Sequence, residues 1–543
     1  MREVHQLPPE VVPDRDSGVP LYRQVYRSLR AAILSGRLQP GTRLPATRAA
    51  ALELGVARNT VVAVFEQLAD EGFVSSRVGD GTRVAEVDAA VLRRSMRSSG
   101  SPIGAATGAR TRARPGAEPG HAAQVGGASL SERGRALAGV ERGSVAIGAF
   151  QTGLPDLAAF PHQAWARLLA RHARAPAADR LGYGDAAGDP HLRAAIAGYV
   201  AAARGVNCTP AQVIVVTGAQ AALDLAARML LDPGDRAWIE EPGYPGARAA
   251  LLAAGARIEP VPVDAAGMDV EAGETSCPGA RLAYITPSCQ YPVGSTLTLE
   301  RRLLLLDWAQ RAGAFVIEDD YDSEYRYRGR PIASVQGLDP HGRVVYVGTF
   351  AKTMLPALSV GYLVAPERLA GAFAAAVRNT GQTAPQPVQG ALAEFIDSGR
   401  YGAHVRRMRN RYAQRQALLF SLAGKYLPGL VELAPTAAGM QVAAWLARGA
   451  DDRAVAEAGR PAGLALRPLS PYWVGPRARP GLHLGYAAVS EEAMEPAVLR
   501  LRRHLVEHAD PIGADLEAVA AGAPPSSGGD SGAGSGHAAP ASS

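Results

Sequence analysis

One lysine of this chain stands where an amine could do chemistry. Only two of its 57 lysine and arginine residues are lysines, Lys352 and Lys425. Arginine replaces lysine as a charge, but it stays protonated and cannot act as a nucleophilic amine. Lys352 follows an apolar run in VYVGTFAKTMLPAL. A lone lysine is more often a solvated surface residue, so Lys352 is a candidate for covalent bonding to a carbonyl group and not more than that.

A second group of candidates is the acidic stretch VIEDDYDSE, residues 316–324. Asp319 and Tyr321 are two residues apart, so both side chains lie on one side of an extended chain. A carboxylate here could pair with a protonated ring nitrogen, and the tyrosine with a ring hydroxyl. The same acids could instead form a solvated loop or a Mg²⁺ or Ca²⁺ site.

Two turns after apolar runs add an anion cradle and an aromatic ring. In VVTGAQ a glycine leads into a helix, and the amides of Gly218, Ala219 and Gln220 could bind a phosphate there. In EEPGYP, Tyr244 could stack on a ring. Such a glycine is often needed only for its turn.

These groups together are what pyridoxal 5'-phosphate requires: an amine for a Schiff base, a carboxylate for the ring nitrogen, amides for the phosphate and a stacking ring. No Walker A pattern surrounds Lys352, which argues against a nucleoside triphosphate. We expect no metal site. We predict that Lys352 is the catalytic residue and that the cofactor is bound by Lys352, Asp319, Tyr321, Tyr244, Gly218, Ala219, Gln220 and Thr349.

The elements that must position these residues alternate between strands and helices. Apolar runs at 213–217, 236–242, 281–287, 315–320 and 343–350 are separated in several places by helical stretches. This alternation predicts an α/β domain with a mostly parallel sheet that is buried on both faces. Ligands in such domains bind beyond the carboxyl ends of the strands. After about residue 385 the pattern becomes more helical, which suggests a smaller C-terminal subdomain.

Residues 17–85 have a different pattern. Apolar residues recur every four positions from Leu21 to Ile33, and LQPGTRLP then breaks the helix. A short helix is expected from Thr47, as its N-cap, to Gly55, and a third helix ends at Gly72. FVSSRVGDGTRVA then has the pattern of a hairpin. This order predicts a winged helix-turn-helix.

A winged helix places the N-terminal turn of its recognition helix against base edges in DNA. Arginines before that helix could neutralise phosphates, and the wing tip could approach the backbone. These side chains could also form a merely solvated surface. The predicted DNA-binding residues are Arg43, Arg48, Arg58, Asn59, Thr60, Gly81 and Thr82.

The stretch from residue 20 to 85 resembles the GntR-type winged helix. The turn PGTRLP, the helix start RNTV and the wing GDGTRV carry the resemblance. One departure is Ala57, where the family usually has a serine or threonine that caps the recognition helix. Loss of that cap should cost about 1 kcal/mol locally.

Residues 150–365 resemble the fold-type I aminotransferase domain of MocR/GabR-type regulators. The stretches LGYGDAAGDPHLRAAIAGYV, EEPGYPG, EDDYDSEYRYRGRP and YVGTFAKTMLPALSVGYLVAP are among those that match. The resemblance implies that Lys352 forms the internal aldimine and that Tyr183 reaches the phosphate site of a partner subunit. It also implies a head-to-tail homodimer.

The sequence departs from that family at several positions. Ala351 replaces a serine before the lysine, Cys289 replaces a histidine, and Ser359 replaces an arginine that clamps the phosphate. We therefore predict a weakened or rebuilt phosphate clamp. Arg467 is a candidate for binding a ligand carboxylate, because the usual position for that arginine holds His483.

Length and composition divide the chain further. At 543 residues and a net charge of +6, it is a multidomain protein that permits a polyanionic partner. Three cysteines without a pairing pattern, and a start without an apolar signal segment, favour a cytoplasmic protein. We predict an N-terminal extension (1–16), a winged helix (17–85), a flexible linker (86–140), an aminotransferase-like domain (141–510) and a disordered tail (511–543).

The sequence thus favours a DNA-binding transcription regulator that senses pyridoxal 5'-phosphate, or its adduct with an amine or amino acid, through Lys352. We expect its partners to be operator DNA, a small amine or amino-acid effector and a second copy of the chain. We expect no membrane contact and no efficient turnover, with residual transaminase activity left open. Two alternatives remain: a working aminotransferase with an autoregulatory DNA-binding module, and a cofactor-free repressor with a degenerate domain.

Overall fold

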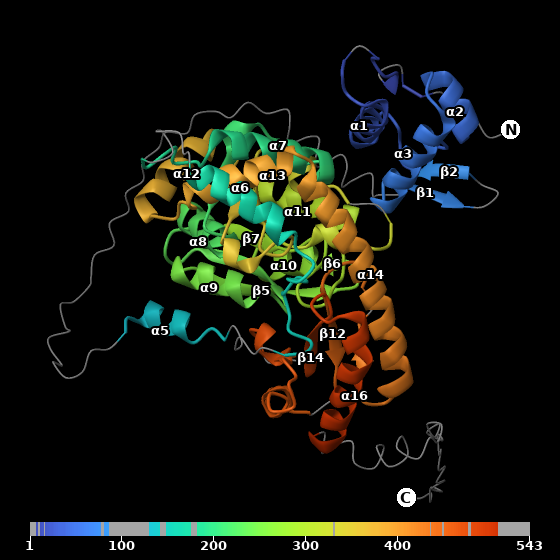
Figure 1. The fold of residues 1–543 in the computed structure, drawn as a ribbon. Coiled ribbons are helices and arrows are strands. Elements are labelled where there is room, and N and C mark those ends of the chain that lie inside the picture. Colours follow the sequence, from blue (N-terminus) through green and yellow to red (C-terminus); the bar gives the residue numbers. More distant parts are fainter. Residues whose placement is uncertain are drawn as a thin grey trace, which may run out of the picture.

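The computed structural model contains a small N-terminal unit beside a large two-part block. In Figure 1 the blue N-terminal unit lies next to the block, and the red C-terminal elements form the lower part of that block. Among the described residues, no helix is long and apolar enough to cross a membrane. The described residues are 7–8, 11–15, 17–77, 81–85, 130–141, 148–174, 182–329, 332–434, 436–447, 450–475 and 479–508.

The N-terminal unit is a winged helix-turn-helix, which confirms the prediction. Apolar residues at four-residue spacing, such as Val25 and Leu29, are buried in its core. The hairpin is antiparallel, and its turn lies outside the described residues. The elements are α1 (Leu21–Leu34), α2 (Thr47–Leu54), α3 (Arg58–Asp70), β1 (Val74–Arg77) and β2 (Gly81–Val84).

The expected cap of α2 was wrong by one residue. Thr47 is already helical, and the N-cap position belongs to Ala46, whose extended backbone begins the helix without a side-chain hydrogen bond. Gly55 ends α2 in the left-handed conformation, as predicted. Ala57 is the N-cap of α3 and makes no side-chain hydrogen bond either. Both helices of the helix-turn-helix therefore begin without a side-chain cap.

The upper part of the block is an α/β domain around an eight-stranded sheet, as predicted. The strand order is β3-β10-β9-β8-β7-β4-β5-β6. The central strands are parallel, whereas β10 is antiparallel to both of its neighbours. The strands are β3 (Val213–Val216), β4 (Arg236–Glu241), β5 (Arg257–Asp264), β6 (Gly267–Met268), β7 (Leu282–Ile285), β8 (Phe315–Asp320), β9 (Val344–Thr349) and β10 (Gly361–Val364).

Helices cover both faces of this sheet. Ile214 and Val216 of β3 pack in the core beneath α8, α9 and α12, whereas Val213 and Val215 pack with α6, α7 and α13 on the other face. Both faces are therefore buried, which explains the nearly continuous apolar runs. The helices are α6 (His162–Arg174), α7 (Pro190–Arg204), α8 (Ala219–Leu230), α9 (Pro245–Ala253), α10 (Val270–Ser276), α11 (Leu299–Ala312), α12 (Glu367–Thr380) and α13 (Gln386–Asp397).

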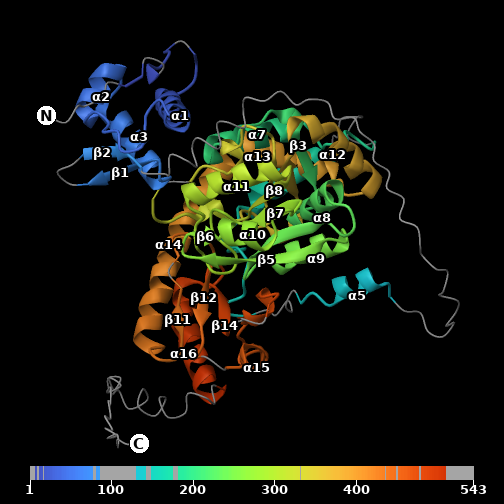
Figure 2. The same ribbon diagram turned by 180° about the vertical axis from the view of Figure 1, so that it is seen from behind.

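The C-terminal subdomain contains a sheet that the sequence pattern did not predict. Figure 2 shows its strands beside α14 and α16. The sheet is antiparallel in the order β11-β12-β14-β13, and its strands are short. Short strands between long helices left a pattern that looked mainly helical. The elements are α14 (Arg400–Tyr426), β11 (Glu432–Leu433), β12 (Gln441–Trp445), α15 (Asp452–Ala458), β13 (Arg467–Pro468), β14 (Gly481–Gly485) and α16 (Glu491–His508).

Two further features concern the connections between these parts. Helix α5 (Glu132–Ala138) lies within the stretch predicted as a linker, whereas residues 86–129 and the predicted tail lie outside the described residues. The winged helix is docked on the block, because Leu299 and Leu303 of α11 belong to its hydrophobic core. The guanidinium of Arg30 also donates a 2.9 Å hydrogen bond to the carbonyl of Gly337.

Candidate functional site

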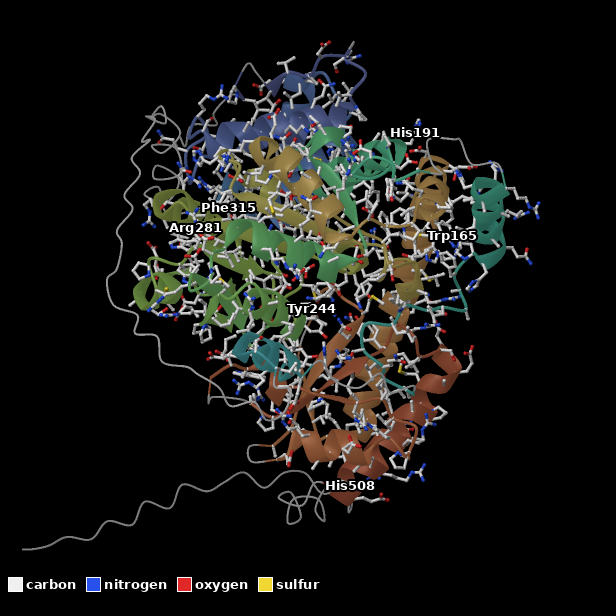
Figure 3. All side chains as sticks on the ribbon, turned by 90° about the vertical axis from the view of Figure 1, so that its left-hand side faces the viewer. Trp165, His191, Tyr244, Arg281, Phe315 and His508 are labelled. Atoms are coloured by element: carbon white, nitrogen blue, oxygen red, sulfur yellow. The ribbon has the colours of Figure 1, made fainter. Side chains whose placement is uncertain are left out.

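A cavity of about 550 Å³ lies at the carboxyl ends of the parallel strands, below the large sheet and above the C-terminal subdomain. In Figure 3 the labelled Tyr244 marks this level of the block. The cavity brings together the predicted cofactor and ligand residues with one exception, Tyr183. Those that line it are Lys352, Asp319, Tyr321, Tyr244, Gly218, Ala219, Gln220, Thr349 and Arg467.

Lys352 follows β9, and its amine is held inside the cavity. The amine donates a 2.9 Å hydrogen bond to the carbonyl of Gly153. Gly153 has a φ of +71°, and a Cβ at this residue would lie 2.6 Å from the amine nitrogen. The hydroxyl of Tyr325 donates to the backbone carbonyl of Lys352 at 3.3 Å. The lysine is therefore fixed at both its backbone and its amine.

Asp319, at the end of β8, has one carboxylate oxygen without a partner. Its Oδ2 accepts a 2.8 Å hydrogen bond from the Tyr284 hydroxyl, while the buried Oδ1 has no hydrogen-bond partner. Burial raises the pKa of Asp319 to about 7, although the Tyr284 hydroxyl opposes that rise. A cationic N–H group at Oδ1 would stabilise the carboxylate. The side chain thus fits a protonated ring nitrogen.

The N-terminus of α8 opens into the same cavity. Gly218 is its N-cap with a φ of 95°, a conformation that favours glycine. The amide of Gly218 already donates to the carbonyl of Val216 at 2.8 Å. The amides of Ala219 and Gln220 in the first turn remain for an anion. The predicted set of three phosphate-binding amides is therefore reduced to two.

The residues near this helix end provide little positive charge. Ser359 lines the cavity in the left-handed conformation, with a φ of 49°. The Thr349 hydroxyl accepts a hydrogen bond from the amide of Ala351 at 3.1 Å, and the methyl of Ala351 adds none. Among the described residues that line the cavity, the basic side chains are Lys352 and Arg467. Neither is the phosphate-clamping arginine.

Arg467 lies on β13, directly across from His483 on β14. Burial lowers the pKa of Arg467, but the hydroxyls of Tyr291 and Tyr472 more than offset this, so its pKa is raised. Burial and the charge of Arg467 lower the pKa of His483 to about 3, and the imidazole Nδ1 has no partner. Arg467 is therefore a permanent cation in the lining of the cavity, and His483, its partner on β14, is neutral.

Three aromatic residues occupy different positions around the cavity. Tyr244 contacts Tyr291 edge-on, with ring centroids 5.4 Å apart. The Tyr321 hydroxyl donates to the carbonyl of Cys289 at 3.1 Å, so only its oxygen lone pairs remain for a ligand. Tyr183 is 99% exposed and lies outside the cavity of its own chain.

Sequence reasoning missed several residues of the cavity. Tyr284 lies in an apolar strand, and its burial, not its polarity, dominated the pattern. Gly153 and Gln441 come from distant segments: the Gln441 side chain accepts a 2.7 Å hydrogen bond from the Gly153 amide. The alternation of side chains along β7 could have predicted that Tyr284 lies on the same face of the sheet as Asp319 of β8. No local sequence signal marks Gly153 or Gln441.

Four of the seven predicted DNA-binding residues are exposed, and the other three are partly buried. Arg58 and Asn59 at the start of α3 are exposed, as is Arg48 in α2. Arg43 and the wing are adjacent, since a Cβ on Gly81 would lie 3.1 Å from the Arg43 Nε. The Arg58 Nε donates a 3.4 Å hydrogen bond to the Thr47 hydroxyl, so the start of α3 lies beside the start of α2. Thr60 and Thr82 are partly buried.

Comparison with protein families matches both parts of the chain. Residues 21–84 match the bacterial regulatory proteins of the gntR family, and residues 151–501 match aminotransferase class I and II. The first match covers the winged helix. The second covers the large sheet domain and the C-terminal subdomain, including the cavity.

Known proteins share this combination over nearly their full length. The chain is 44% identical over 496 residues to the probable rhizopine catabolism regulatory protein MocR of Rhizobium meliloti, covering 91% of this chain and 95% of that protein. It is 30% identical over 495 residues to the HTH-type pyridoxine biosynthesis transcriptional regulator PdxR of Corynebacterium glutamicum, covering 90% and 96%.

The block also has solved relatives. One is LysN, the alpha-aminoadipate aminotransferase of Thermus thermophilus, complexed with N-(5'-phosphopyridoxyl)-L-leucine. It matches with a TM-score of 0.64 and 27% sequence identity, covering 69% of this chain and 97% of that one. The block is thus similar to an enzyme solved with a pyridoxyl compound.

Proposed function

Because this chain belongs to the MocR/GabR type of GntR-family regulators, we propose that its aminotransferase-like domain uses pyridoxal 5'-phosphate to sense a small amine or amino acid. A chain of this type is a DNA-binding transcription regulator. Its aminotransferase class I and II fold implies dependence on pyridoxal 5'-phosphate. The observation that supports cofactor binding most directly is the partnerless Oδ1 of Asp319 in the cavity that also holds the Lys352 amine.

Each part of the cofactor has a matching group in this chain. When bound, the cofactor supplies an aldehyde that reacts with amines and a ring that withdraws electrons. The Lys352 amine would bind the aldehyde carbon, and Asp319 would hold the proton on the ring nitrogen. The amides of Ala219 and Gln220 would bind the phosphate, and Tyr244 would lie against the ring.

Arg467 would select ligands that carry a carboxylate as well as an amine. It is the one arginine among the described residues that line the cavity, and its raised pKa keeps it charged at any physiological pH. Arg467→Gln should lower the affinity of an amino-acid effector about tenfold or more, since a hydrogen bond to a charged group is lost. Cofactor affinity should change far less, which separates the two roles.

The winged helix would read operator DNA with the turn that begins α3. Arg58 and Asn59 are exposed there, and these side chains recognise guanine and adenine by paired hydrogen bonds. Arg43 and Arg48 would contact phosphates beside the site. Arg58→Ala should relax sequence preference, whereas Arg48→Ala should weaken binding to all sequences alike.

We propose a head-to-tail homodimer and cytoplasmic action. The exposure of Tyr183 supports a dimer, because a tyrosine side chain that reaches the phosphate site of a partner subunit must project away from its own subunit. The boundaries proposed from the sequence, 17–85 for the winged helix and 141–510 for the aminotransferase-like domain, leave residues 86–140 to connect them. Ligand binding at Lys352 would then reposition the winged helix.

An absorbance titration of the purified protein with pyridoxal 5'-phosphate tests the cofactor half. We expect a visible band that free cofactor lacks, and a change in that band when the effector is added. A parallel measurement of DNA binding by fluorescence anisotropy, with and without ligand, tests the regulatory half. A protein that never develops the band would show that the domain acts as a cofactor-free scaffold.

A working aminotransferase is the second candidate function. It is favoured by one observation, that the candidate amine Lys352 and the candidate carboxylate anchor Arg467 line one cavity. Steady conversion of an amino acid and a keto acid, abolished by Lys352→Ala, would establish it.

A further inference from the structure

A second cavity, of about 470 Å³, lies at the junction between the winged helix and the block. Its walls come from α1 of the winged helix and from α7 and α14 of the block. Residues Ser323 and Glu324 of a short 3₁₀ turn after β8 line it as well. Its volume lies within the range of about 300–1,000 Å³ that small-molecule sites occupy. It is separate from the cavity that contains Lys352, called the cofactor cavity below. The two cavities share no lining residue.

Basic side chains outnumber acidic ones in the lining of this junction cavity, with five arginines and two glutamates. Arg23 and Arg27 of α1 and Arg406 of α14 all line it, and none of the three has an ion pair within the described residues. Arg409 of α14 lines it as well, but its Nε donates a hydrogen bond to the backbone carbonyl of Glu324. Arg204, by contrast, is neutralised by Asp320 at 2.7 Å. The three unpaired arginines come from both sides of the junction, so an anion between them would bridge the two domains.

The carboxyl groups of the cavity do not cancel this charge. Burial raises the pKa of Glu71, whose oxygens accept hydrogen bonds from Tyr26 and Gln67. Burial and the charge of Asp320 raise the pKa of Glu324 to about 7. Glu324 is therefore partly neutral near neutral pH, and burial shifts Glu71 toward its neutral form as well, so the arginines of the lining outweigh its two acids.

One buried polar group in the cavity lacks a partner. The Ser323 side chain is 4% exposed, and its hydroxyl makes no hydrogen bond. Buried hydroxyls are normally paired, because an unpaired one has lost its water without replacement. An anion oxygen within reach of Ser323 would satisfy it.

We propose that the junction cavity is a binding site for a small organic anion with at least two negative charges, a phosphomonoester or a polycarboxylate. Arginines from α1 and α14 bind its charged groups, and the Ser323 hydroxyl donates to one of its oxygens. The ligand holds the winged helix against the block. It is thus a second effector, distinct from the amine or amino acid of the cofactor cavity.

The two cavities are connected by one short segment. Asp319 and Tyr321 line the cofactor cavity, and Ser323 and Glu324 line the junction cavity. Tyr325 follows directly and donates to the carbonyl of Lys352. A displacement of residues 319–325 by either ligand therefore changes both sites. Coupling of this kind is reciprocal: each ligand changes the affinity of the other by the same factor.

The test is calorimetric titration of the full-length protein, without free cofactor, with citrate and with glycerol 3-phosphate. Acetate serves as the monoanion control. We expect at least one of the first two to bind, and the double substitution Arg27→Gln/Arg406→Gln to weaken it about tenfold or more. Arg400→Gln, an exposed arginine of α14 outside the cavity, should change the affinity less than about twofold.

Two further measurements make the site assignment decisive. Lys352→Ala should leave the anion affinity unchanged; a loss of binding would place the anion in the cofactor cavity and overturn the proposal. The double variant should bind operator DNA as tightly as Arg400→Gln when no anion is present. A selective loss of DNA affinity would mean that these arginines contact DNA phosphates, which also overturns it. So would the absence of binding by both probes at millimolar concentration.

Discussion

The two ends of the cofactor cavity are built differently. At one end Asp319 and Tyr284 are buried, Lys352 is half-buried, and hydrogen bonds hold all three side chains or their backbones in place. At the other end two helix amides and the Thr349 hydroxyl face the cavity, and Ser359 occupies the position where the family resemblance implies an arginine. The residues expected to act on the cofactor ring are therefore all present, whereas the arginine expected to hold the phosphate is absent.

Because of this difference, the groups that would react with the cofactor are distinct from the groups that would keep it bound. A helix N-terminus contributes about 0.3–1 kcal/mol to binding a charge, less than the roughly 1.5–3 kcal/mol of a charge-assisted hydrogen bond. A cavity with such an anchor would release its cofactor more readily than an enzyme that needs permanent occupancy. We infer that occupancy itself varies with cofactor concentration, which suits a sensor.

The largest effect should come from Lys352→Ala, which removes the one amine among the described residues that line the cavity, at the end that would hold the cofactor ring. The visible band should disappear, and effector should no longer change DNA affinity, because no other described side chain of the cavity can replace the amine. Absorbance and fluorescence anisotropy on the same sample measure both. Lys425→Ala is the matched control, since that lysine is on the exposed end of α14 and should behave as wild type. Unchanged ligand-dependent DNA binding in Lys352→Ala would disprove the coupling.

The residues at the ring end of the cavity could largely be predicted from the sequence, because each of them lies at or just after the end of a strand. β4, β8 and β9 were expected from apolar runs, and parallel strands bring their carboxyl ends to one edge. These two regularities are enough to predict from the sequence that Tyr244, Asp319 and Lys352 lie together.

Contacts between distant segments could not be predicted in this way. Gly153 receives the hydrogen bond of the Lys352 amine across 199 residues, and no periodic pattern encodes such a pairing. The C-terminal sheet was missed because β11 and β13 are two residues long. The loss of the Gly218 amide to Val216 depends on backbone geometry that sequence does not specify.

The next largest effect should come from Asp319→Asn. The amide cannot hold a protonated ring nitrogen, so loss of this charge-assisted hydrogen bond should lower cofactor affinity about 10- to 150-fold. Titration by absorbance measures it. Asp322→Asn is the control: it is buried in the same segment but does not line the cavity, so its affinity should stay close to wild type. Equal losses in both variants would mean that buried charge in general, and not contact with the ring, controls affinity.

The phosphate end should respond in the opposite direction. Ser359→Arg introduces the missing cation and should tighten cofactor binding about tenfold, toward the lower limit for such a bond because position 359 is exposed. Ser359→Ala has the same unfavourable backbone conformation without the charge and should bind as wild type does. If Ser359→Arg and wild type bind equally, another group has rebuilt the clamp, and the two ends differ less than their sequences suggest.

The smallest effect concerns pH and again distinguishes the two ends. Burial raises the pKa of Asp319 to about 7 in the protein without cofactor, and pairing with a protonated ring nitrogen favours the carboxylate. Below that pKa the carboxyl must lose a proton before it can pair, so cofactor affinity should fall about twofold between about pH 8 and about pH 7, and more steeply below. In Asp319→Asn the ionisable groups of the cofactor still titrate, but the Asp319 carboxyl is absent. The pH dependence of the ratio of wild-type to variant affinity therefore isolates Asp319. A ratio that does not change with pH would show that the carboxylate is ionised throughout, with its Oδ1 satisfied by water.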